Sequence, residues 1–135
     1  MAASSPSPEQ REVADVLLRR AESDLRACRR LADEPDMEDD VVGFHAQQAV
    51  EKAVKAALVL HGVDFPRSHD LDFLLARAEG RGLRIPDRIE DAEWLTPWAA
   101  QLRYDEAAEP LDRSAAIEAA TSAVGWARSL LDESR

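Results

Sequence analysis

A dense set of polar side chains falls within one short stretch of the sequence that is rich in small and apolar residues, residues 44–60. They are Gln47, Gln48, Glu51, Lys52 and Lys55. The small and apolar residues between them recur at three- and four-residue spacing, which places those residues on one face of a helix. Polar groups beside a helix crossing normally have assigned partners. We therefore expect the two lysines to meet phosphates while Gln48 and Glu51 orient them, or the whole set to specify how helices pair.

The pair Arg103–Tyr104 is a second candidate, at the end of a predicted helix that begins near Trp94. A guanidinium beside a phenol ring can bind an anionic phosphate and stack on a nucleobase. The alternative is structural, with Arg103 paired to an acidic residue such as Glu51 inside the protein and Tyr104 packed. The residues alone favour the structural alternative, and both stay open at this point.

His69 and Asp70 are a third candidate, because they directly precede an apolar run that begins at Leu71. Asp70, or Ser68 just before it, is placed to cap a helix. A histidine beside a carboxylate is also a general acid/base pair. Helix capping is the first interpretation, and acid/base chemistry is the second.

Several common catalytic signatures do not occur in the sequence. Its five glycines are scattered and form neither a phosphate-binding loop nor a dinucleotide fingerprint. The sequence has one cysteine and three histidines, and no two of these residues are spaced i, i+4, so it does not predict a zinc site. The Glu-x-x-His repeat of di-iron bundles is also missing. We therefore predict neither a metal nor a cofactor.

The overall charge restricts the class of partner. The formal charge is 17 − 27 = −10, and a domain this acidic repels a phosphate backbone. Arg19, Arg26 and Arg30 share one stripe of the first predicted helix, but Glu22 and Asp24 are interleaved, so we interpret the stripe as a solvated face. The charge disfavours RNA and favours a protein partner with a basic face.

The sequence also indicates a location. No apolar run approaches the ~20 residues that a membrane span needs, and the first residues lack the basic start and apolar core of a signal peptide. Cys28 forms no internal disulfide, which fits a reducing compartment. Its place in an apolar helical stripe predicts a buried small hydrophobe rather than a reactive thiol. We expect a cytoplasmic protein without a membrane segment.

The elements that must position these residues are all helical. Ala, Leu, Arg, Glu and Asp dominate, with few β-branched or aromatic residues, which favours an all-α fold. Residues 1–8 are rich in Ser and Pro and are expected to form a disordered tail before a single domain over residues 9–135. Periodicity predicts two long helices over about 9–32 and 40–61. A third helix is expected to begin at Ser68 or Asp70 and to end at Gly80 and Gly82. A short helical piece is expected to begin at Pro86, and further helices are expected over 94–104 and 110–132.

Together these helices predict an up-and-down bundle of about five helices. The buried stripe expected for its first helix consists of Val13, Val16, Leu17, Leu25, Cys28 and Leu31. Gly62 is expected to end the second helix as its C′ residue.

Four motifs in order along the chain resemble the HEPN family, the nucleotide-binding domain of higher eukaryotes and prokaryotes, in its stand-alone prokaryotic branch. They are Ala-x-x-Asp-Leu (21–25), Phe-x-x-Gln-Gln-Ala-x-Glu-Lys-Ala-x-Lys-Ala (44–56), Pro-x-x-His-Asp-Leu (66–71) and Leu-Thr-Pro-x-x-x-x-x-Arg-Tyr (95–104). The resemblance implies a bundle of about five helices that usually forms a homodimer with a functional cleft. It further implies one of two activities, a metal-independent ribonuclease that often acts as the toxin of a toxin–antitoxin pair, or a partner of a minimal nucleotidyltransferase. Nucleotide binding is ascribed to some members.

The sequence departs from the ribonuclease branches at their main motif. Those branches place a histidine four to six residues after an arginine, and no histidine follows Arg103 in this chain. The proline that usually follows Arg-Tyr is replaced by Asp105, which adds negative charge where an RNA backbone would lie. The departure therefore favours a binding role over catalysis.

The sequence thus predicts a non-catalytic binding or regulatory domain that binds a nucleotide and partners a minimal nucleotidyltransferase. The expected ligand-binding residues are Gln48, Glu51, Lys52, Lys55, His69, Asp70, Arg103 and Tyr104. One alternative is a divergent metal-independent ribonuclease that uses Arg103 with His69 or Tyr104. Another is a purely structural dimeric module in which the polar set specifies helix register.

Overall fold

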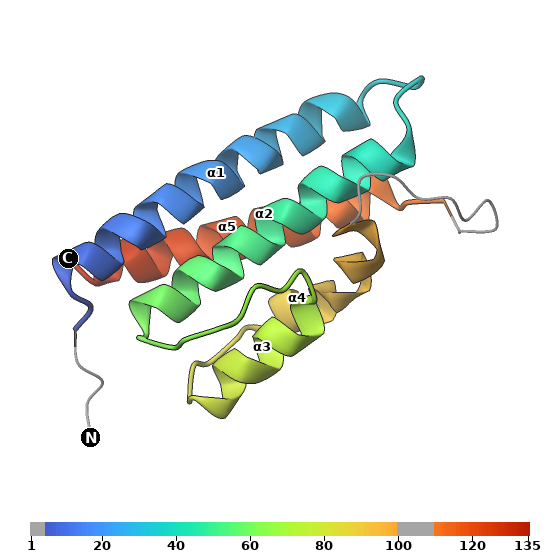
Figure 1. The fold of residues 1–135 in the computed structure, drawn as a ribbon. Helices are drawn as coiled ribbons and strands as arrows, with labels where there is room; N and C mark the ends of the chain where they lie inside the picture. Colours follow the sequence, from blue (N-terminus) through green and yellow to red (C-terminus); the bar gives the residue numbers. More distant parts are fainter. Residues whose placement is uncertain (1–4, 100–109) are drawn as a thin grey trace.

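The computed structural model describes residues 5–99 and 110–135, and every regular element in these ranges is helical (Figure 1). The elements are α1 (Pro8–Ala32), α2 (Asp39–Leu60), α3 (Leu71–Gly80), α4 (Asp87–Glu90), the 3₁₀ helix η1 (Asp91–Ala99) and α5 (Arg113–Glu133). The prediction of an all-α fold is confirmed. Within the described residues, no helix has the length and apolar character that crossing a membrane requires.

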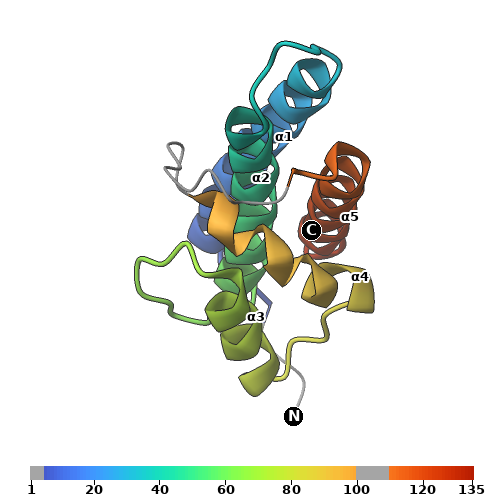
Figure 2. The same ribbon diagram turned by 90° about the vertical axis from the view of Figure 1, so that its right-hand side faces the viewer.

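The three long helices α1, α2 and α5 run alongside one another, and α2 is the central one (Figures 1 and 2). It packs against α1 and α5 and also against α3 and η1. The shorter elements α3, α4 and η1 gather on the side of α2 away from α1 (Figure 1). The segment between α2 and α3, which carries His69, therefore runs next to the central helix.

Local signals set most helix ends close to their predicted places. Ser7 begins α1 with a capping box, in which its hydroxyl accepts from the Gln10 backbone and its own backbone amide donates to the Gln10 side chain. Of the tail expected over residues 1–8, residues 1–4 lie outside the described part, while Ser7 caps α1 and Pro8 begins it. Gly62 has a φ of +67° after α2, as its predicted C′ role requires.

Two ends differ from the prediction. The last helix begins at Arg113 rather than Pro110, because the Asp112 carboxylate caps it by accepting from the Ala115 backbone amide. The piece expected from Trp94 begins at Asp91 and is a 3₁₀ helix. Its predicted continuation to Tyr104 lies outside the described residues.

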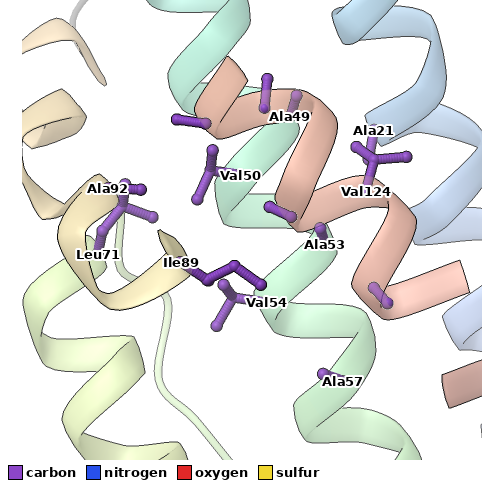
Figure 3. Close-up of a cluster of buried hydrophobic side chains, with 14 of the residues drawn as sticks. Ala21, Ala49, Val50, Ala53, Val54, Ala57, Leu71, Ile89, Ala92 and Val124 are labelled. Atoms are coloured by element: carbon purple, nitrogen blue, oxygen red, sulfur yellow. The ribbon is translucent and has the colours of Figure 1, made fainter. Parts of the chain in front are cut away.

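Alanines form the seam along which α2 meets its neighbours. The apolar residues predicted for its inner face are all buried: Ala46, Ala49, Val50, Ala53, Val54, Ala57 and Leu58. Figure 3 shows α2 between Leu71, Ile89 and Ala92 on one side and Ala21 and Val124 on the other. Small side chains let backbones approach closely, so one helix can pack against several others at once.

The buried stripe of α1 is displaced from the prediction. Leu25 and Cys28 are buried as expected, but Val13 is 50% exposed and Val16 is 37% exposed. The residues buried in their place are Ala14, Leu18 and Ala21. The prediction placed the larger apolar residues in the core. The buried residues of α1 include two alanines instead, because small side chains allow α1 to approach α2 and α5 closely.

Cys28 is fully buried, which confirms its predicted role as a small core hydrophobe. Burial raises the pKa of its thiol from 9.0 to about 11, because the apolar surroundings disfavour the thiolate. The thiol therefore stays protonated and unreactive at neutral pH.

Candidate functional site

A buried carboxylate, that of Glu51 on α2, is the centre of a hydrogen-bonded network. Its Oε1 accepts from Gln47 Nε2 at 3.0 Å, from His69 Nδ1 at 2.8 Å and from Gln48 Nε2 at 3.5 Å. Its Oε2 accepts from Lys55 Nζ at 3.1 Å. A buried carboxylate is costly unless it is paired and hydrogen-bonded, and these four donors supply its partners.

Gln47 connects this network to the segment that follows α2. Its Nε2 also donates to the His69 backbone carbonyl at 3.0 Å, and its Oε1 accepts from Gln48 Nε2 at 2.7 Å. Gln47 is fully buried and is the member of the network that the predicted ligand-binding set omitted. Its signal in the sequence was its place directly before Gln48 in the same polar set.

His69 and Asp70, adjacent in sequence, have separate tasks. The Asp70 carboxylate caps α3 by accepting from the backbone amides of Asp72 and Phe73, at 3.1 and 3.4 Å, which confirms the capping interpretation. The His69 imidazole donates from Nδ1 to Glu51, which leaves Nε2 as an acceptor when the ring is neutral. The side chain of His69 is exposed, so this Nε2 is presented to solvent from a fixed ring.

Lys52 belongs to a second network, apart from Glu51. Its Nζ lies 2.5 Å from Asp24 Oδ2 on α1, and the other oxygen of Asp24 lies 3.0 Å from His45 Nδ1. Asp24 was predicted to lie on a solvated face, and His45 was not among the predicted site residues. A signal for Asp24 was available, since it is the acidic residue of the Ala-x-x-Asp-Leu motif.

Lys55 joins the Glu51 network to an aromatic surface. Its Nζ lies 5.8 Å from the centroid of the Phe65 ring, in the range of a cation–π contact. Phe65 and Val59 line a surface hollow of about 340 Å³, together with Gln10, Gly62, Val63 and Asp64. The ammonium group thus lies near an aromatic ring, and that ring in turn lines an open hollow.

The family of the chain follows from a comparison with protein-family models. The model described as "HEPN domain" matches residues 14–134, which include most of α1, all of α2 and the whole Glu51 network. The chain belongs to the HEPN domain family. The family resemblance predicted from the four motifs is therefore confirmed.

One curated relative of this HEPN domain is the protein named "Putative toxin MJ1304" from Methanocaldococcus jannaschii. The two are 44% identical over 54 residues, which cover 40% of this chain and 34% of that protein. The match thus spans about a third of the relative's length. No solved structure matches the chain.

Arg103 and Tyr104 of the HEPN domain lie outside the described residues. Their predicted contact with a ligand, and the alternative pairing of Arg103 with Glu51, both stay predictions. The structure does describe η1, which precedes them, and there Trp98 is buried against Gly43 of α2.

A second hollow of the HEPN domain lies between α3 and the α4–η1 segment and is strongly acidic. It has a volume of about 270 Å³, and its lining includes Asp72, Glu79, Glu90, Asp91 and Glu93. A side-chain hydrogen bond with Asp72 raises the pKa of Glu93, because the shared proton favours the neutral acid. In residues 5–99 and 110–135, no group of three or more His, Cys, Asp or Glu side chains is arranged to hold a metal ion.

Proposed function

We propose that this HEPN domain is a binding and regulatory subunit that binds a nucleotide and partners a minimal nucleotidyltransferase, in a toxin–antitoxin setting in the cytoplasm. The observation that carries the proposal is the position of Lys55. Its ammonium group contacts the Glu51 carboxylate and lies 5.8 Å from the centroid of the Phe65 ring, which lines an open hollow.

A nucleotide fits this arrangement through two kinds of contact. Its phosphate meets Lys55 and the exposed imidazole of His69, both of which Glu51 orients. Its base lies against Phe65 in the hollow, since a nucleobase stacks on any aromatic face. The Gln48 side-chain amide also donates to the Glu51 carboxylate. By resemblance to the family, Arg103 and Tyr104 complete the site.

The charge of the chain and its family both support the proposed protein partner. A formal charge of −10 suits a protein partner with a basic face better than free RNA. The relative's name, "Putative toxin", supports a toxin–antitoxin setting. Homodimer formation is proposed on the family resemblance alone.

Calorimetry with AMP and ATP tests the nucleotide site. The wild-type chain is expected to bind at least one of them, and His69→Gln to weaken binding about tenfold, ~1.4 kcal/mol, through loss of a phosphate contact. Phe65→Leu is expected to cost about 1–3 kcal/mol by removing the stacking surface. His61→Gln is the matched control, because the His61 imidazole donates to the Ala57 carbonyl at the end of α2 and, within the described residues, takes no part in the Glu51 network.

Either of two results would contradict the proposal. In the first, neither nucleotide binds and no nucleotidyltransferase encoded next to this chain co-purifies with it. In the second, His61→Gln weakens binding as much as His69→Gln does.

One observation favours a second function, that of a metal-independent ribonuclease. The Glu51–His69 pair holds an imidazole with Nε2 facing solvent, as a general base requires, and His69 could take the proton from a ribose 2′-OH. Arg103 would stabilise the phosphate in the transition state.

On this alternative the wild-type chain cuts labelled RNA in the presence of EDTA, both His69→Gln and Arg103→Ala abolish cutting, and His61→Gln does not. An RNA substrate left intact by the wild-type chain rules out this alternative.

A further inference from the structure

The exposed side of α1 carries two large apolar residues that the core does not use. This helix lies at the edge of the bundle, where it packs against α2 and α5 (Figure 1). On its other side Val13 is 50% exposed and Val16 is 37% exposed. Single apolar residues scattered over a surface are ordinary. These two are three positions apart on one helix, so they are neighbours and form one patch.

The two valines belong to a longer line of exposed residues along α1. Glu9 precedes Val13 by four positions, and Arg20 follows Val16 by four. At about 100° per residue, the four side chains lie within about 60° of one another around the helix axis. Steps of four, three and four residues are the spacing of the contact line of a coiled coil. We call Glu9, Val13, Val16 and Arg20 the α1 seam.

The two charged residues of the α1 seam are available for another molecule. Within the part of the chain that the structure describes, neither Glu9 nor Arg20 forms an ion pair. The nearest acidic candidate for Arg20 on its own helix is Asp24, four positions later, and Lys52 Nζ lies 2.5 Å from that carboxylate. The seam therefore has an acid at one end, a base at the other, and apolar side chains between them.

The complement of this seam is a second copy of the same seam, in the antiparallel direction. When a twofold axis passes between residues 14 and 15, Val13 of each copy faces Val16 of the other, and Glu9 of each copy faces Arg20 of the other. In a parallel pair every residue would face itself, so that Glu9 would meet Glu9 and Arg20 would meet Arg20. Charge complementarity therefore selects the antiparallel direction.

We infer that the α1 seam is the face through which two copies of this chain associate, as an antiparallel pair of α1 helices related by a twofold axis. The inference rests on the homodimer of the proposed function and deepens it by naming the face and the register. It uses no residue of the nucleotide site. Because only two valines of each copy lie at its centre, the dimer is expected to dissociate on dilution.

Sedimentation velocity over a range of chain concentrations tests the charge pairs. Arg20→Glu is expected to weaken the dimer about tenfold or more, because it sets a carboxylate against Glu9 at both ends of the interface. Combining Glu9→Arg with Arg20→Glu exchanges the two charges and is expected to restore the dimer. Arg84→Glu is the matched control, since it makes the same change of charge at an exposed position between α3 and α4. Circular dichroism checks that each variant keeps its helical fold.

Disulfide cross-linking tests the register. Chains that carry Val13→Cys, mixed with chains that carry Val16→Cys and oxidised mildly, are expected to form a disulfide between the two variants. Neither variant alone is expected to cross-link. A parallel pair would instead cross-link each variant with itself. The native Cys28 does not interfere, because it is buried.

The outcomes separate the inference from the proposed function. A dimer that Arg20→Glu leaves unchanged, or that Arg84→Glu weakens equally, overturns the inference and leaves the proposed homodimer to another face. Loss of the dimer in Arg20→Glu that the exchanged pair does not restore also overturns it. A wild-type chain that is monomeric at every concentration removes both the inference and the proposed homodimer. The nucleotide proposal is decided separately, by calorimetry with AMP and ATP.

Discussion

Replacing Glu51 by leucine is expected to lower the free energy of unfolding by about 3–5 kcal/mol, the cost of leaving a charge without its partner in a buried pair. The substitution removes the acceptor of four donors, from Gln47, Gln48, Lys55 and His69. Gln47 is fully buried, and of its three hydrogen bonds it would keep those to the His69 carbonyl and from Gln48 while losing the one to Glu51. Chemical denaturation followed by circular dichroism measures the loss.

A double substitution separates the charge from the packing. Lys55→Met combined with Glu51→Leu is expected to lose less stability than Glu51→Leu alone, because no uncompensated charge remains. Glu51→Gln keeps the shape and one acceptor oxygen, so its expected loss lies between wild type and Glu51→Leu. A Glu51→Leu chain that unfolds within about 1 kcal/mol of wild type, the lower end of ordinary hydrogen-bond effects, would show that Glu51 does not stabilise the bundle.

Gly43→Ala is expected to destabilise the bundle by about 1–3 kcal/mol, the usual cost of overpacking a core. A Cβ atom at this position would lie 2.5 Å from Cε3 of Trp98, which is far inside van der Waals contact. Trp98 is a rigid, buried ring on η1, so either α2 or η1 must shift. The melting temperature measures the loss, and the intrinsic fluorescence of tryptophan reports any displacement of η1.

Gly125→Ala provides the matched control. Gly125 lies inside α5 on the exposed side, and among the described residues no atom beyond the adjoining backbone of α5 lies within 4 Å of a Cβ built there. Alanine is a better helix former than glycine, so this change is expected to stabilise the chain by about 0.5–1 kcal/mol. If both alanine substitutions raise the melting temperature, the close approach of Gly43 to Trp98 does not constrain the fold.

Features that depend on neighbouring residues in the sequence were predictable. The apolar spacing along residues 46–58 predicted the inner face of α2, and every residue on that face is buried. Gly62 and Asp70 were predictable as a helix end and a helix start, because a positive φ and a capping hydrogen bond involve only a few adjacent residues. The four motifs were sufficient to predict the family.

Features that depend on how helices lie against each other were not predictable. In α1 the sequence reasoning selected Val13 and Val16, but α2 and α5 cover Ala14 and Leu18 instead. Both lines of residues have helical spacing, and only the positions of the neighbouring helices decide which one is buried. A pattern within one helix carries no information about those positions.

The candidate site divides in the same way. The sequence by itself determined that Gln48, Glu51, Lys52 and Lys55 lie on one helix and that His69 follows it closely. The i, i+4 spacing of Glu51 and Lys55 already favours their pairing within α2. Only the tertiary structure decided that Lys52 and His45 pair with Asp24 and that His69 pairs with Glu51. The two lysines are three positions apart and so lie only about 60° from each other around α2. The packing of α1 and of the segment before α3 around α2 brings Asp24 to Lys52 and His69 to Glu51.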